Sequence, residues 1–426
     1  MFRPSRSELP EYSCKVTTGE SVPSPQRTNI FLTLGGLAVA GTIIGQLGAT
    51  SATTLASDGN GGLETGIFLS VMLAFAGIAT MSVNRLTSRW GRLRVFALAQ
   101  AAIAVSWSLV GLIEMFTTTS LLVLWLSAPV FGVFSGVTMV LTPFLARQFI
   151  DPSSLDTSLA RRSVAVGIAT IVGASLGGYI IHQTDPGVGI LANGVLTSPL
   201  AIFLLRSSHQ SIDVTAAAKS PTARELVTAL WSNAKLRSFA VLTVCSMVVT
   251  VPMFNMVVPL LNSIDHAPLP SGAGLMLAGI AGGRLLVPMT VKRILRRQTE
   301  FGGALSASIG VTGFMLIFAA STAIPFTQFD LVVWTIIGIC LGASRFTVHT
   351  LVIAGGAHSA TPGKEQSGVA GLALLATVSL PIGTLLWGLS LDYLAATATV
   401  AISALTMTTL VVWLAFAVRR NRPVST

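Results

Sequence analysis

Positive charge is confined to one side of a long series of apolar runs. Of the 26 Lys and Arg residues, all but Arg284 and Arg345 lie in the polar tails or in or beside alternate gaps between the runs. Cytoplasmic loops of membrane proteins carry an excess of Lys and Arg. The other gaps contain no Lys or Arg and carry the acidic residues Asp58, Glu64, Glu114, Asp185, Asp265, Asp330 and Asp392. The pattern predicts a multi-pass protein of the cytoplasmic membrane with both termini in the cytoplasm.

The apolar runs are long enough to cross a bilayer, whose hydrocarbon core of about 30 Å needs about 20 apolar residues per helix. Twelve runs are recognisable, roughly 29–50, 64–84, 95–116, 121–146, 163–183, 187–206, 237–261, 270–291, 301–321, 331–355, 367–389 and 396–418. Only 10% of the chain is charged and its mean hydropathy is +0.76, whereas soluble domains have about 25% charged residues. We therefore expect an all-α membrane protein with twelve transmembrane helices.

The longest internal gap divides the chain into two similar halves. Run 4 contains Gly132-x3-Gly136 and run 10 contains Gly338-x3-Gly342, while runs 5 and 11 begin with Ser163-x3-Gly167 and Ser367-x3-Gly371. Both matches are six spans apart, which favours an internal repeat. We predict two six-helix bundles at 29–206 and 237–418, joined by a cytoplasmic loop at 207–236 with a short helix after Pro221. Cytoplasmic tails occupy 1–28 and 419–426.

Twelve spans, a central loop and a duplicated half resemble the major facilitator superfamily over nearly the whole chain. Between spans 2 and 3 that family typically has Gly-x-Leu-Ala-Asp-Arg-x-Gly-Arg-Arg. The corresponding segment here is Asn84-Arg85-Leu86-Thr87-Ser88-Arg89-Trp90-Gly91-Arg92, in which Leu86, Arg89, Gly91 and Arg92 match. The resemblance implies that this loop gates the cytoplasmic side. Ser88 replaces the acid of the family's charge relay, so a relay here needs another partner.

Span 5 contains a cluster of small residues, Gly167-x5-Gly173-Ala174-Ser175-Leu176-Gly177-Gly178. This is similar to the Gly-Pro-x-x-Gly-Gly element of drug-exporting antiporters in the same superfamily, with Ala174 at the proline position. The resemblance implies export. Close packing of helices through small residues is the alternative explanation. Exporters of this type often carry an arginine within span 4, whereas here Arg147 lies at its cytoplasmic end.

Two cations inside the apolar runs are the strongest candidates for a substrate site. A charged side chain within a bilayer is costly and usually functional. Arg345 and His349 lie four residues apart in span 10, which places them on one face of a helix. We expect Arg345 to bind an anionic or polar group and His349 to be a protonation site, although both could instead be satisfied within the core. Arg284, in span 8, either lines the same cavity or extends to the cytoplasmic interface.

Other polar residues in the spans are weaker candidates. Glu114 lies near the outer end of span 3, where it is either a solvated end residue or a proton acceptor. Span 7 contains Asn255 between Pro252 and Pro259, and such interrupted helices form binding sites or gates in transporters or are simple kinks. Asn255 and Gln46, which lies in span 1, are candidates for the cavity wall.

Several functions lack the residues that they require. The sequence has no phosphate-binding Gly-x4-Gly-Lys-Ser/Thr loop and no His-Glu-x-x-His segment, which are common signatures of nucleotide and zinc sites. Its three cysteines, Cys14, Cys245 and Cys340, are far apart. We therefore expect no enzymatic activity, no cofactor and no metal. The formal net charge of +10 follows from the loops and does not indicate binding to nucleic acid.

These observations predict a monomeric secondary transporter in the lipid bilayer, which rocks two halves about a central site. The leading hypothesis is export of a small amphipathic metabolite or drug-like molecule by proton antiport. The alternative is uptake of a small anionic solute by proton symport, with Arg284 and Arg345 holding the anion. A hypothesis of another class is a membrane sensor or scaffold without transport, which predicts buried arginines that are paired internally.

Overall fold

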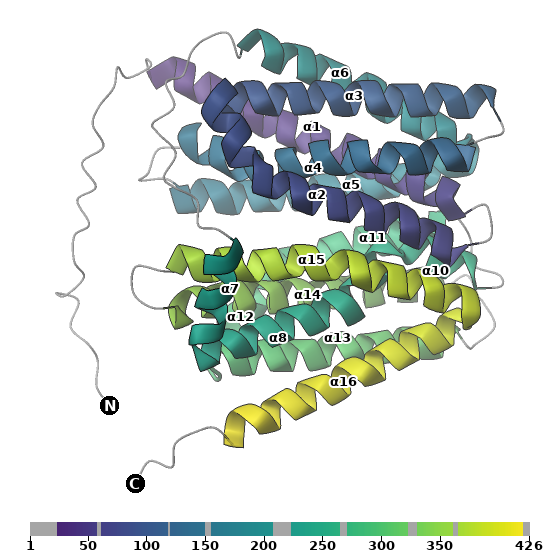
Figure 1. Cartoon of the computed structure of the whole chain (residues 1–426). Coiled ribbons are helices and arrows are strands. Elements are labelled where there is room, and N and C mark those ends of the chain that lie inside the picture. The colour runs from purple at the N-terminus through teal and green to yellow at the C-terminus, as the bar shows by residue number, and fades with distance from the viewer. Residues whose placement is uncertain are drawn as a thin grey trace.

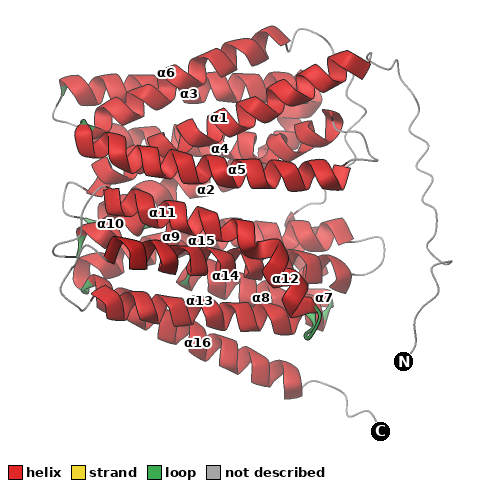
Figure 2. Cartoon of the chain, turned by 180° about the vertical axis from the view of Figure 1, so that it is seen from behind, coloured by secondary structure: helices red, strands yellow, loops and turns green. Residues whose placement is uncertain are grey.

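The computed structural model describes residues 24–57, 61–117, 120–149, 155–207, 223–264, 271–322, 330–360 and 365–420. Every regular element in these ranges is a helix (Figure 2). The predicted tails, for the most part, and residues 208–222 of the central loop lie outside them. The first half of the chain forms α1 (Ser24–Ser57), α2 (Gly62–Trp90), α3 (Arg92–Phe116), α4 (Ser120–Phe149), α5 (Leu155–Gln183) and α6 (Pro186–Ser207).

The second half contains more elements because two of its spans are interrupted. A short helix, α7 (Ala223–Ser232), precedes them. Span 7 consists of α8 (Ala234–Val249), α9 (Val251–Asn255) and α10 (Val257–Asn262), and span 8 of α11 (Ser271–Gly283), the 3₁₀ turn η2 (Arg284–Leu286) and α12 (Val287–Leu295). Spans 9 to 12 are α13 (Glu300–Thr322), α14 (Asp330–Ser359), α15 (Glu365–Tyr393) and α16 (Ala396–Arg420).

Length and hydropathy agree with the twelve predicted spans. Nine stretches of helix in the described part of the chain are long and apolar enough to cross a membrane. The remaining three spans are α5, which has the shorter apolar stretch Val164–Ile180, the interrupted span 7, and α1, a helix of 34 residues. At 1.5 Å per residue, α1 is longer than the bilayer requires.

The helices form two stacked bundles, one from α1 to α6 and one from α8 to α16 (Figure 1). The bundles meet mainly along two helix pairs, α2 with α15 and α5 with α11, and α10 also contacts α1 and α2. Span 8 is the repeat equivalent of span 2, and span 11 that of span 5. The two pairs are therefore equivalent when the halves are exchanged, as expected for halves related by a two-fold axis.

The repeated glycines make equivalent helix contacts in both halves. Gly132 and Gly136 of α4 lie against the backbone of α2 at Met72 and Ala76. Gly338 and Gly342 of α14 lie against the backbone of α11 at Met276 and Ile280 in the same way. At Gly136 and Gly342 a Cβ atom would overlap a carbonyl oxygen of the facing helix. Small residues allow this approach in a membrane, where packing rather than water exclusion joins helices.

The contacts between the halves begin at one end of the bundle. We call the end that carries Glu64, Asp185 and Asp392 the acidic end, and the end that carries Arg85, Arg89 and Lys292 the basic end. At the acidic end the amide of Leu63 donates to Asp392 Oδ1 at 3.1 Å, and the hydroxyl of Ser70 donates to the carbonyl of Pro381 at 2.8 Å. Gly66 packs on Gly388, and Gly274 on Gly178. The halves are therefore closed against each other at the acidic end.

Candidate functional site

Arg345 and His349 lie near the middle of α14, one turn apart. α14 runs from Asp330 to Ser359, so Arg345 is about halfway along it. The Arg345 side chain is half-buried, whereas His349 is exposed. Arg345 interacts electrostatically with Arg284, and His349 interacts with both arginines. The three cationic candidates from the sequence are thus brought together.

A glycine contact between spans 8 and 10 places Arg284 beside Arg345. Gly283 lies directly against the backbone of α14 between Ile339 and Ala343, where a Cβ atom would overlap main-chain atoms. Arg284 follows this contact by one residue, and Arg345 follows Ala343 by two. Close approach of the two backbones therefore brings both guanidinium groups to the same level.

Pro288 explains why span 8 changes its helical form at Arg284. In an α-helix the amide of residue 288 would bond to the carbonyl of residue 284, but proline has no N–H. The amide of Val287 donates to the Arg284 carbonyl instead, which closes the 3₁₀ turn η2. A short 3₁₀ stretch within a helix often marks a functional hinge. Arg284 is exposed at this turn.

Two phenylalanines complete the site. The guanidinium carbon of Arg345 lies 4.3 Å from the ring centroid of Phe254 and 5.2 Å from that of Phe346. The guanidinium carbon of Arg284 lies 5.3 Å from the same Phe346 ring. Within about 6 Å a cation is attracted to the face of an aromatic ring. We call Arg284, Arg345, Phe254 and Phe346 the cation–aromatic cluster.

The cluster carries positive charge without a carboxylate to balance it. Among the described residues, no Asp or Glu forms an ion pair with Arg284, Arg345 or His349. An ion pair does form between His358 and Glu300, at 3.1 Å, but it lies at the basic end and not in the cluster. The aromatic faces offset only part of the cost of two guanidinium charges within the membrane, because a cation–aromatic contact contributes about 0.5–2 kcal/mol. The site is therefore suited to a negatively charged ligand.

Phe254 reaches the cluster from the interruption in span 7. The helix is broken at Thr250 and again at Met256, close to the two prolines that predicted an interruption. The break frees the carbonyl of Val249, which accepts a hydrogen bond of 2.8 Å from the indole nitrogen of Trp387 in α15. A freed backbone group within a membrane must find such a partner. Sequence reasoning missed Phe254, Phe346 and Trp387, because an aromatic residue in an apolar span is not distinctive.

Among the residues that the structure describes, no contact is shown between the cation–aromatic cluster and the weaker candidates Asn255, Gln46 and Glu114. Asn255 is the last residue of α9 and is half-buried. Gln46 lies in α1, where its Cβ packs against Gly173 of α5. Glu114 lies at the acidic end beside Gly187, at the start of α6. Its distance from the cluster along the bundle makes Glu114 the less direct candidate for coupling.

The loop between spans 2 and 3 is a tight turn at the basic end. Gly91 has a φ of +81°, which favours glycine, and its amide donates to the Thr87 carbonyl at 2.9 Å. The Ser88 hydroxyl donates to the Arg85 carbonyl at 2.9 Å within the same helix. Arg85 and Arg89 are exposed, Arg92 is half-buried, and the side chain of Asn84 lies outside the described residues. Ser88 thus bonds locally, and it forms no bridge to another helix among the residues that the structure describes.

The small residues of span 5 pack against two helices. Gly173 and Gly177 lie against α1, at Ile43 and Leu47. Ala174 and Gly178 lie against Gly274 of α11, in the other half, and Gly167 lies against Leu285. The motif therefore serves both packing within its half and closure between the halves.

The arrangement of helices is shared with known transporters. A family model described as Major Facilitator Superfamily matches residues 30–377. A crystal structure of a mutant of the nucleoside transporter NupG is similar, with a TM-score of 0.75 and 14% identity over 91% of this chain and 99% of that chain. A bacterial homologue of the human lysosomal transporter Spinster, inward-facing and unoccupied, has a TM-score of 0.66 and 13% identity over 93% and 96% of the two chains.

The human organic anion transporter MFSD10 is also similar, with a TM-score of 0.57 and 14% identity over 92% of this chain and 100% of that chain. No curated protein matches the chain in sequence. At these identities the likeness to solved structures shows the fold and not the substrate.

Proposed function

The chain belongs to the major facilitator superfamily of membrane transporters, and we propose that it carries a small organic anion through the cytoplasmic membrane by proton symport. The observation that supports this is the pair of guanidinium groups, Arg284 and Arg345, which no described carboxylate balances. An acidic group on the substrate would pair with the guanidiniums. An apolar or aromatic part would pack on Phe254 and Phe346.

The charges at the site favour symport over antiport. A bound anion offsets the positive field of both arginines at His349, which interacts with each of them. Anion binding and protonation of His349 therefore support each other, since opposite charges nearby favour the charged form and such coupling is reciprocal. Uptake of one negative charge against a potential of about 100 mV, negative inside, costs about 2.3 kcal/mol. One accompanying proton removes that electrical cost.

The span-5 motif favours a second candidate, export of an amphipathic molecule by proton antiport. Its resemblance to the exporters rests on the small residues that join α5 to α11. Antiport requires the proton and the substrate to compete, which a neutral or cationic substrate would satisfy better than an anion. The direction of pH-driven transport separates the two candidates.

Proteoliposomes provide the test. Small carboxylates with an apolar group are compared with their neutral amides under an inward proton gradient. We expect accumulation of a carboxylate but not of its amide, and its loss in Arg345→Ala with unchanged membrane insertion. The alanine variant removes the half-buried charge at the middle of α14 and both of its aromatic contacts. Preference for the amides, or full transport by Arg345→Ala, would contradict the proposal. Efflux driven by the same gradient would favour antiport.

The orientation in the membrane is part of the same proposal. The Lys- and Arg-rich gaps support a cytoplasmic position for the basic end, because cytoplasmic loops carry an excess of Lys and Arg. The structure, which is closed at the acidic end, then represents a conformation closed towards the outside. Reporter fusions after Asn60 and after Ala217 should report opposite sides of the membrane, with Ala217 in the cytoplasm. The same side for both would overturn the assignment.

A further inference from the structure

One helix contacts both the closed end of the transporter and the interruption in span 7. α15 carries Thr384 and Gly388 against Gly66 of α2, in the other half. It also carries Gly383 and Trp387 against span 7. Each of these pairs is spaced by four residues, so each forms a stripe on one face of the helix. Adjacent residues differ by about 100° around a helix of 3.6 residues per turn, so the two stripes face different neighbours.

The stripe that faces span 7, Gly383 and Trp387, packs against the backbone just before the helix break at Thr250. A Cβ atom at Gly383 would lie 2.6 Å from the Met247 carbonyl and 2.6 Å from the Val248 carbonyl, so glycine permits the approach. One turn further on, the buried indole of Trp387 donates to the Val249 carbonyl at 2.8 Å. Gly383 and Trp387 of α15 thus lie against three consecutive backbone groups of span 7, and Trp387 bonds to the last of them.

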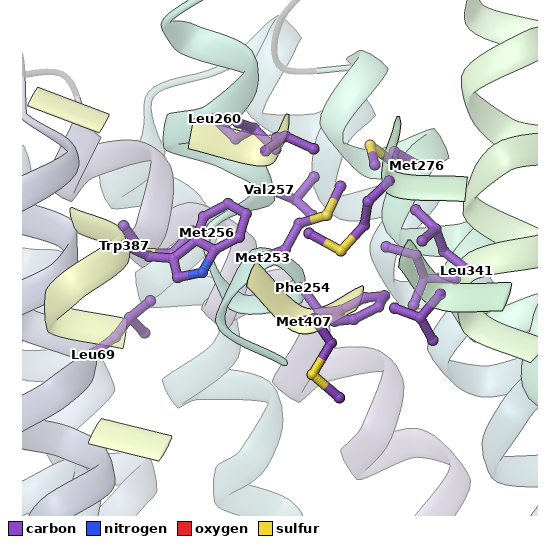
Figure 3. Packing of buried hydrophobic residues seen from close by; sticks show 14 of the residues in the cluster. Leu69, Met253, Phe254, Met256, Val257, Leu260, Met276, Leu341, Trp387 and Met407 are labelled. Atoms are coloured by element: carbon purple, nitrogen blue, oxygen red, sulfur yellow. The ribbon is translucent and has the colours of Figure 1, made fainter. Parts of the chain in front are cut away.

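The segment after the break carries the aromatic face of the substrate site. α9 begins at Val251, two residues after the bonded carbonyl, and Phe254 on α9 lies under the Arg345 guanidinium. Figure 3 shows Trp387, Met253, Met256 and Phe254 within one buried cluster. The position of Phe254 therefore depends on how α9 leaves the break, and Trp387 holds the break on the side of α15.

We propose that Trp387 is a positioning residue, which couples closure of the acidic end to the shape of the cation–aromatic cluster. While α15 is packed on α2, Trp387 holds the Val249 carbonyl and Phe254 covers Arg345. When the halves separate at the acidic end, α15 moves relative to span 7, the hydrogen bond is released, and Phe254 leaves the guanidinium. Only the consequence for substrate affinity rests on the proposed function. The contact itself can be tested without a substrate.

Trp387→Phe removes the indole donor and keeps an aromatic ring. The matched control is Trp334→Phe, because Trp334 is equally buried and its indole donates to Ser321 at 3.2 Å, away from span 7. The native Cys245, four residues before Val249, reports on the break when Cys14 and Cys340 are replaced by serine. We expect N-ethylmaleimide to label Cys245 about tenfold faster in Trp387→Phe, because an unpartnered carbonyl favours opening, and at the parental rate in Trp334→Phe.

Transport by the same variants gives a second readout. Trp387→Phe should raise the KM for the transported carboxylate about tenfold and change the maximal rate less than about twofold. Gly383→Ala tests the same contact without altering the tryptophan. Its control is Gly313→Ala, since nothing lies within 4 Å of a Cβ atom at Gly313. If Trp387→Phe and Gly383→Ala both label like their controls, the inference is overturned. If they label faster while no carboxylate is transported, the proposed function fails, and the role of Trp387 and Gly383 in holding the break stands.

Discussion

At the scale of single residues, the role of Arg345 is indicated by the groups that surround its guanidinium more than by its charge alone. A guanidinium group in a membrane span can be satisfied by an acid, by backbone carbonyls, or by water and a ligand. The Arg345 guanidinium lies against two aromatic rings, and the nearby guanidinium of Arg284 repels it. Within the described part of the chain no acceptor is shown for the hydrogen-bond donors of Arg345, which suits them to binding a ligand. It also argues against the sensor or scaffold hypothesis, which predicted arginines paired internally.

His349 is the residue whose replacement best separates binding from coupling. His349→Gln keeps a polar side chain of similar length but cannot take up a proton near neutral pH. We expect it to exchange the carboxylate across proteoliposomes at equilibrium and to lose accumulation driven by a pH gradient. Counterflow and gradient-driven uptake on the same preparation measure the two properties. Retained accumulation would transfer the coupling role to Glu114 or to a sodium ion.

At the scale of elements, glycine contacts decide which residues meet. The site exists because α11 and α14 cross in direct backbone contact at Gly283 and Gly342, which draws Arg284 to Arg345. The neighbouring Gly282 has a different role, because a Cβ atom there would be 3.7 Å from Ile171, an ordinary packing distance. A side chain can therefore be accommodated at Gly282 but not at the adjacent Gly283.

This difference gives a matched pair of variants. Gly283→Ala forces α11 away from α14 and should lower the free energy of unfolding by about 1–3 kcal/mol, the usual cost of overpacking. Gly282→Ala should be close to neutral. Thermal unfolding in detergent measures both, and anion binding to the folded fraction should weaken only in Gly283→Ala. Equal melting temperatures for the two variants would contradict the crossing described here.

At the scale of the whole molecule, the two halves are held together at the acidic end. Gly62 and Gly66 at the start of α2 pack on Leu391 and Gly388 near the end of α15. In an alternating-access cycle this contact must open and close, since the halves move about a central site. Its small residues leave few side chains to rearrange when the halves separate.

A cross-link at this contact should stop the cycle. A Cβ atom at Gly62 would lie 2.5 Å from the Cβ of Leu391, which is closer than the roughly 3.8 Å between the Cβ atoms of a disulfide. After a small outward shift of the two helix ends, Gly62→Cys with Leu391→Cys should form a disulfide when the native cysteines are replaced by serine. We expect oxidation to block transport and reduction to restore it. Each single cysteine variant, treated identically, controls for oxidation elsewhere. Undiminished transport by a fully cross-linked protein would show that the acidic end does not open.

The sequence by itself determined the spans, the repeat and the family. Each span is specified locally, because a helix must match the bilayer and charges in loops resist translocation. The fold class and the twelve spans are confirmed on these grounds. The interruption of span 7 followed from Pro252 and Pro259, because proline removes a backbone donor wherever it stands.

Only the tertiary structure decided what each functional residue contacts. The sequence left Arg284 with two destinations, because a long flexible side chain can reach either the cytoplasmic interface or the cavity. Its place beside Arg345 depends on the crossing of two helices about 60 residues apart in the chain. Phe254 and Trp387 could not be distinguished from other aromatic residues, since their roles come from an uncovered charge and a freed carbonyl on other helices. Such pairings arise from the packing of the helices, which hydropathy and charge do not encode.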